Sequence, residues 1–149
     1  MEIKKFNVIG ISIRTTNENG QSVKDIPALW NQFLTEEIIT KIPNKTSNEI
    51  YCIYTDYKKD HTAPYTTILG CAVENLESIP EGMIGKTIEN SNYEKFIAKG
   101  NLTEGAVYNE WVKIWNSDLK RAFTSDFEVY GEKAQYLKNA EVDIFIAIQ

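Results

Sequence analysis

The sequence predicts an α+β fold in which a strand–helix–strand–strand unit occurs twice, at about residues 6–74 and 93–148. Short runs of β-branched and aromatic residues that alternate with polar ones indicate strands, and two stretches with apolar residues three and four positions apart indicate amphipathic helices. Because these elements recur in the same order, we expect pseudo-two-fold symmetry and two main helices on one face of a mostly antiparallel sheet. The length of 149 residues is that of a single domain, which we expect to span residues 1–149.

The first unit is expected to begin with a strand at residues 6–14, where isoleucines alternate with other residues. A helix follows, with Asp25 as the expected N-cap and Pro27 in the first turn, where its missing N–H costs nothing. The helix should end before Pro43, since the residue preceding a proline is driven out of the helical region. Its apolar stripe consists of Ile26, Leu29, Trp30 and Phe33.

Two strands complete the first unit, at residues 50–57 and 65–73. Both are rich in β-branched and aromatic residues, and the polar segment 58–64 between them favours an antiparallel pair. A connector with a short strand at residues 83–88 then leads to the second unit, whose first strand is expected at residues 93–99.

The second unit contains the clearest helix of the chain, expected at about residues 103–122. Two strands at residues 127–130 and 142–148 follow it, and in the last of them apolar residues occupy every second position. The stripe of the helix consists of Tyr108, Trp111, Val112, Trp115, Leu119 and Phe123.

Composition and charge exclude several classes of function. The formal net charge of −5 provides no broad basic field, which argues against direct binding to nucleic acid. No apolar stretch approaches the roughly 20 residues that cross a bilayer, and the first residues lack the apolar core of a signal peptide, so we expect a cytoplasmic protein without membrane contact. Cys52 and Cys71 are too few for a disulfide scaffold. The lone His61 has no partners at metal-ligand spacing, so we expect a solvated loop histidine, no metal site and no cofactor.

Glu128 is the residue that most needs an explanation, because it lies in an aromatic and apolar run. If the run is a strand, Phe127 and Val129 face one way while Glu128 and Tyr130 face the other. Either that face is in water and the acid is a solvated surface group, or it lines an aromatic cavity where an unpaired carboxylate attracts a cation. The pattern alone favours the solvated alternative, since Glu is almost never fully buried without a partner.

Seven stretches, taken together, resemble the GyrI-like family of small-molecule (effector) binding domains. This family includes the ligand-binding domains of AraC-type and MerR-type multidrug regulators, and also stand-alone proteins of this length. The order and spacing of the stretches carry the resemblance, which covers about residues 6–148. Because no residues remain for a helix-turn-helix unit, the chain resembles the stand-alone members, and we expect no control of transcription in cis. The stretches are VIGISIRT (8–15), IYCIYTDYKKDH (50–61), YTTILG (65–70), IPEGM (79–83), WVKIW (111–115), DFEVY (126–130) and AEVDIFIAI (140–148).

The resemblance implies a small-molecule cleft between the two halves, walled by aromatic side chains, with a buried glutamate that pairs with lipophilic, cationic ligands. Glu128 occupies the matching position, and Tyr130, Trp111, Trp115 and Tyr54 are the candidate wall residues. The implied function is a stand-alone binding protein linked to transcription regulation or to the drug response. Two alternatives remain open. One is hydrolysis of strained-ring genotoxic compounds with Glu128 as general base, and the other is inhibition of a protein partner, as by gyrase inhibitors.

Overall fold

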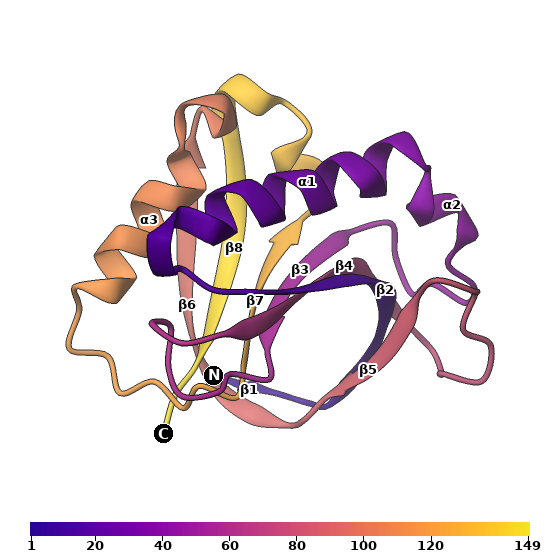
Figure 1. Ribbon diagram of the computed structural model, residues 1–149, viewed down its shortest axis with the longest axis horizontal. Coiled ribbons are helices and arrows are strands. Elements are labelled where there is room, and N and C mark those ends of the chain that lie inside the picture. Colours follow the sequence, from indigo (N-terminus) through magenta and orange to yellow (C-terminus); the bar gives the residue numbers. More distant parts are fainter.

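The computed structural model describes residues 1–149 and shows one curled, eight-stranded antiparallel sheet with two main helices against one face (Figure 1). This confirms the predicted α+β class. The helices are α1 (Gln21–Thr35), α2 (Ile38–Lys41) and α3 (Ala106–Trp115), with 3-10 turns at Glu18–Gly20, Leu102–Glu104, Glu132–Ala134 and Leu137–Asn139. The strands are β1 (Glu2–Ile3), β2 (Phe6–Thr15), β3 (Ile50–Thr55), β4 (Tyr65–Val73), β5 (Ile84–Ile88), β6 (Ser91–Gly100), β7 (Ser125–Tyr130) and β8 (Ala140–Ala147).

The strand order β1-β6-β8-β7-β3-β4-β2-β5 contains the predicted repeat. In each unit the last of the three strands pairs with the other two, so that β6-β8-β7 on one side of the sheet mirrors β3-β4-β2 on the other. The two units meet at the antiparallel pair of β3 and β7, where Cys52 lies opposite Glu128. The pseudo-two-fold arrangement expected from the element order is therefore present.

Each long helix packs on the strands of its own unit. Phe33 of α1 belongs to the same buried cluster as Leu69 of β4, and Ile114 of α3 belongs to the same buried cluster as Ile144 of β8. A third apolar cluster, which includes Phe127, lies on the opposite face of the sheet. The meeting strands β3 and β7 therefore run beneath the space between α1 and α3, with Glu128 on the helix side.

The start of α1 differs from the prediction. The helix begins at Gln21, so Asp25 is not its N-cap and Pro27 lies in its interior. The Asp25 carboxylate instead accepts hydrogen bonds from the Thr15 hydroxyl (2.9 Å) and the Gln21 amide (3.0 Å), tying the first helical turn to β2. An acid inside the first turns looks like a cap in sequence, but its partners come from the fold. At the other end, α1 stops at Thr35.

Left-handed residues explain two further differences. Glu37 has φ 50° and separates α1 from α2, and Asp56 has the same φ and ends β3 two residues before the predicted boundary. In the second unit α3 covers only Ala106–Trp115, because the chain leaves the helix after Asn116 and extends so that Arg121 bridges Ile148 of the last strand segment. The predicted helix over 103–122 was therefore too long at both ends.

Cys52 and Cys71 are free thiols in the buried core. None of the helices combines the length and apolar character that a bilayer crossing requires.

Candidate functional site

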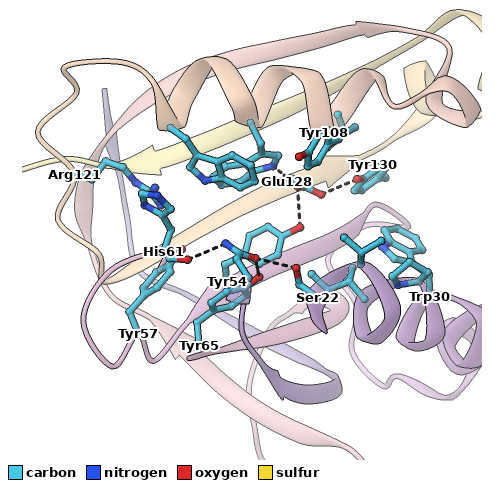
Figure 2. A pocket seen from close by; sticks show the side chains of 17 residues that line it. Ser22, Trp30, Tyr54, Tyr57, His61, Tyr65, Tyr108, Arg121, Glu128 and Tyr130 are labelled. Carbon is cyan, nitrogen blue, oxygen red and sulfur yellow. Dashed lines mark hydrogen bonds between the residues drawn. The ribbon is translucent and has the colours of Figure 1, made fainter. Parts of the chain in front are cut away.

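A cavity of about 380 Å³ opens between α1, α3 and the β3–β7 pair, with Glu128 pointing into it (Figure 2). Most of its lining is aromatic or aliphatic, and both units contribute. The lining residues are Asn17, Ser22, Val23, Ile26, Pro27, Trp30, Tyr54, Tyr57, His61, Tyr65, Val107, Tyr108, Trp111, Trp115, Arg121, Glu128 and Tyr130.

Glu128 is 1% exposed and accepts three hydrogen bonds from three different elements. The hydroxyl of Tyr130, two residues further along β7, donates to Oε1 at 2.6 Å. Oε2 accepts from Tyr54 of β3 at 2.9 Å and from the indole Nε1 of Trp111 of α3 at 2.6 Å. The strand alternation predicted from sequence put Glu128 and Tyr130 on one face, and that face looks into the cavity. The solvated alternative for Glu128 is therefore wrong.

These donors hold the carboxylate but supply no charge. Burial raises the pKa of Glu128 above its ordinary value, and the hydrogen bonds from Tyr130, Trp111 and Tyr54 oppose this rise only in part. Burial also raises the pKa values of Tyr54 and Tyr130 well above the ordinary value of 10.0, and the Glu128 charge adds to the effect. Both phenols thus remain protonated donors, and the carboxylate has no cationic side chain as a partner.

Aromatic rings surround this carboxylate, and neighbouring rings pack edge to face against each other. Tyr54 meets Trp111 with centroids 5.4 Å apart and an interplanar angle of 84°, and Trp30 of α1 meets Tyr130 at 4.8 Å and 75°. Trp115 lies one turn along α3 from Trp111, at 6.2 Å, and contributes to the wall without touching Glu128. The structure thus brings all five sequence-predicted site residues to one cavity, four of them in a hydrogen-bonded cluster.

His61 was expected to be a solvated loop residue, and this expectation was wrong. Its ring stacks on Trp115 at 5.8 Å and 15° and on Phe123 at 6.3 Å and 28°. Its backbone carbonyl accepts a hydrogen bond from the Asn17 side chain at 2.8 Å, which draws the loop over the cavity. Burial and the neighbouring Arg121 charge lower the pKa of His61, so the ring is neutral at pH 7. A long-range contact of this kind leaves no local signal in the sequence.

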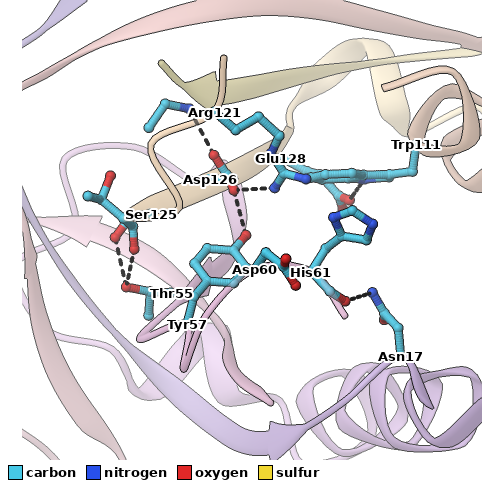
Figure 3. A network of polar contacts seen from close by, with 12 residues as sticks. Asn17, Thr55, Tyr57, Asp60, His61, Trp111, Arg121, Ser125, Asp126 and Glu128 are labelled. Carbon is cyan, nitrogen blue, oxygen red and sulfur yellow. Dashed lines mark hydrogen bonds and ion pairs between the residues drawn. The ribbon is translucent and has the colours of Figure 1, made fainter. Parts of the chain in front are cut away.

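A second buried polar cluster lies beside the first (Figure 3). Arg121, which sequence reasoning missed, donates from Nη2 to Oδ2 of Asp126 at 2.8 Å. Asp126 is 0% exposed and also accepts from the Tyr57 hydroxyl at 2.5 Å and from the backbone N–H of Ala147 at 2.8 Å. The charges of this pair therefore cancel, because the Arg121 guanidinium and the Asp126 carboxylate neutralise each other.

The buried charges therefore do not balance. Asp126, Glu128 and Arg121 are the buried ionisable Asp, Glu, Lys and Arg side chains of the chain. With Asp126 paired to Arg121, the ionised form of Glu128 leaves one uncompensated negative charge inside the aromatic cavity. No three His, Cys, Asp or Glu side chains come together in a group that could hold a metal ion.

Comparison with known proteins gives a consistent result. Residues 1–148 match the family of integron-associated effector-binding proteins. The chain is 28% identical over 153 residues to the putative transcriptional regulator protein YobU of Bacillus subtilis (strain 168), covering 100% of this chain and 94% of that one. The integron cassette protein VCH_CASS2 from the mobile metagenome of Vibrio cholerae is 29% identical, with a TM-score of 0.78 over 100% of this chain and 94% of the other.

A third relative shares the fold alone. The structure of SAV2435 bound to tetraphenylphosphonium has a TM-score of 0.82 at 15% identity, over 100% of this chain and 92% of the other. Together these matches confirm the resemblance to GyrI-like effector-binding domains.

Proposed function

The chain belongs to the family of integron-associated effector-binding proteins, and from this premise we propose that it captures lipophilic, cationic small molecules in the cavity at Glu128. The observation that carries the proposal is the buried Glu128 carboxylate, which has three neutral donors and no cation. A monovalent cation in the cavity compensates the one unbalanced buried charge. The aromatic lining adds to the attraction, because each ring face contributes about 0.5 to 2 kcal/mol toward a nearby cation.

The relatives support this choice of ligand and suggest what its capture is for. Tetraphenylphosphonium, which is bound by a protein of the same fold, is itself a lipophilic cation. A relative described as a putative transcriptional regulator supports a role in which occupancy of the cavity is communicated to transcription or to the response to drugs.

The test compares Glu128→Gln with the unmodified protein by titration calorimetry at neutral pH, using tetraphenylphosphonium and the neutral triphenylmethanol. A cation centre about 5 Å from the carboxylate gains roughly 3 kcal/mol at an effective dielectric constant near 20, of which desolvation takes back about half. We therefore expect the variant to bind tetraphenylphosphonium at least tenfold more weakly and triphenylmethanol within twofold of the original affinity. Equal affinity of both proteins for the cation would contradict the proposal.

A matched control changes the same residue type at the surface. Glu94 on β6 is exposed and lies away from the cavity lining, so Glu94→Gln removes one negative charge without altering the site. It should bind both compounds as the unmodified protein does. A loss of cation affinity in this variant would mean that the overall charge of the protein, and not Glu128, sets the preference.

Hydrolysis with the same carboxylate is the second candidate. The observation that favours it is the combination of a raised Glu128 pKa with only one hydrogen bond to Oε1, so that a lone pair of this oxygen has no donor within the protein. Incubation of excess protein with a strained-ring compound, followed by mass spectrometry of the products, separates binding from turnover. Quantitative recovery of the intact compound would exclude chemistry on it.

A further inference from the structure

The cavity has a second polar end, which the proposed function does not use. The Arg121 side chain is 5% exposed and lines the cavity, and only its Nη2 has a hydrogen-bond partner, Asp126. A guanidinium carries five N–H donors. Its Nε and Nη1 nitrogens are buried and have no acceptor.

No acceptor of the protein lies within hydrogen-bond distance of these donors. Asp126 is already shared with Tyr57 and the Ala147 N–H. The other neighbours are ring faces, with the guanidinium carbon 4.4 Å from the centre of Phe123 and 5.8 Å from that of Trp111. Ring faces attract the charge but do not replace a lone pair. Since buried donors are rarely left unpaired, this end of the cavity is matched to an acceptor that the chain itself lacks.

His61 adds a further unpaired nitrogen at the same place. Its Nδ1 is buried without a partner, and its ring lies beside the Arg121 guanidinium (Figure 3). The ring is held only by stacking on Trp115 and Phe123. A neutral imidazole that carries its proton on Nδ1 is a donor, so His61 would supply a second donor to an acceptor at this end of the cavity.

The charges select a neutral acceptor over an anion. Asp126 already neutralises Arg121, and Glu128 is bonded to the same indole, that of Trp111, which the guanidinium contacts. A ligand carboxylate here would lie near two carboxylates of the protein, whereas a carbonyl oxygen requires only donors. We propose that Arg121 and His61 form a subsite for a ketone or amide carbonyl of the same ligand whose cationic group faces Glu128. This inference rests on the proposed function, because both groups bind in one cavity.

The experiment uses two cations that differ only in the carbonyl group: (4-benzoylbenzyl)trimethylammonium and (4-benzylbenzyl)trimethylammonium. Affinities are measured by calorimetry for the full-length protein, Arg121→Lys and Glu128→Gln. Lysine keeps a positive charge opposite Asp126 but removes the additional N–H donors. We expect the benzoyl compound to bind about tenfold more tightly to the unmodified protein, as for a hydrogen bond to a charged donor, and the ratio to fall to near one in Arg121→Lys.

A spectroscopic measurement on the unmodified protein tests the carbonyl hydrogen bond without relying on the Arg121→Lys variant. The infrared carbonyl stretch of the bound benzoyl compound should lie at lower frequency than in an apolar solvent, because a hydrogen bond weakens the C=O bond. Equal affinity of the two cations for the unmodified protein, or an unshifted carbonyl stretch, overturns the proposal. A tenfold ratio that persists in Arg121→Lys overturns the assignment to Arg121.

Glu128→Gln separates this proposal from the one on which it rests. It should weaken both cations to the same degree and leave their ratio unchanged. If it weakens neither cation while the ratio of ten remains, the cation-binding function fails and the carbonyl subsite stands.

Discussion

The two indoles of α3 differ in one bond, and this difference allows the worth of the Glu128 hydrogen bonds to be measured. Trp111 donates to the carboxylate at 2.6 Å, while Trp115, one turn away, stacks on His61 and makes no such bond. Replacing either by phenylalanine keeps an aromatic ring on the wall. Only Trp111→Phe removes a donor from the buried acid.

The expected loss of stability follows from two contributions. A hydrogen bond to a charged group is worth about 1.5 to 3 kcal/mol. Exchanging an indole for a phenyl ring removes roughly 40 Å² of buried apolar area, or about 1 kcal/mol. We therefore expect Trp111→Phe to lower the free energy of unfolding by about 2.5 to 4 kcal/mol at pH 8, where Glu128 is ionised in more of the molecules than at lower pH, and Trp115→Phe by about 1 kcal/mol.

The pH dependence distinguishes the hydrogen bond from simple packing. Loss of the donor raises the pKa of Glu128 further, because the indole favours the ionised carboxylate. At pH 5 the acid is protonated in more of the molecules, and the excess cost of Trp111→Phe over Trp115→Phe should shrink by roughly 1 to 2 kcal/mol. Urea denaturation followed by far-UV circular dichroism measures both variants at both pH values. An excess cost that is absent, or that does not change with pH, would refute the reasoning.

Three further predictions concern the same buried charges and the end of α1. Burial raises the folded-state pKa of Glu128 above 4.5, so the stability of the unliganded protein should fall as pH rises from 4.5 through that pKa; Glu128→Gln cannot titrate and should abolish this decline in denaturation curves. Asp126→Asn leaves the Arg121 charge buried and unpaired and should lower the free energy of unfolding, measured by urea denaturation, by about 3 to 5 kcal/mol. An unchanged denaturation midpoint would argue against a stabilising Arg121–Asp126 ion pair. Glu37→Gly removes about 1 to 2 kcal/mol of left-handed backbone strain at φ 50° and returns about 0.5 to 1 kcal/mol of chain entropy, so thermal melting should show a net gain of about 0.5 to 1 kcal/mol.

The sequence was sufficient for the arrangement of elements because each strand and helix carries its own periodicity. Alternation alone placed Glu128 and Tyr130 on one face, and the helical spacing placed Trp111 and Trp115 on another that meets it. It could not decide between solvent and cavity, because that depends on the helix that covers the strand. The family resemblance supplied this information.

The polar end of the cavity could not be predicted for a different reason. Arg121 lies in a segment that helical periodicity assigned to α3, but that segment pairs instead with the end of the chain, through the Arg121–Ile148 bridge and the hydrogen bond from Ala122 N–H to the Ala147 carbonyl. His61 reaches the cavity through its stacking on Trp115 and the hydrogen bond from Asn17, which are separated from it by 54 and 44 positions. Contacts over such separations have no local pattern.

The pairing of Cys52 with Glu128 at the meeting of the two units has a consequence for how a ligand is oriented. Each of these residues is followed two positions later by a tyrosine. The Tyr54 and Tyr130 hydroxyls donate hydrogen bonds to different oxygens of the Glu128 carboxylate. An identical duplicate would place an acid on both strands at directly opposed positions about 5 Å apart, where two charges repel. With the Cys52 thiol in place of a second acid, both tyrosines are kept and only one buried charge, that of Glu128, lies between them. The buried charge at the meeting of the two units therefore lies on the β7 side only, and a cationic ligand bound there would direct its charged group toward β7.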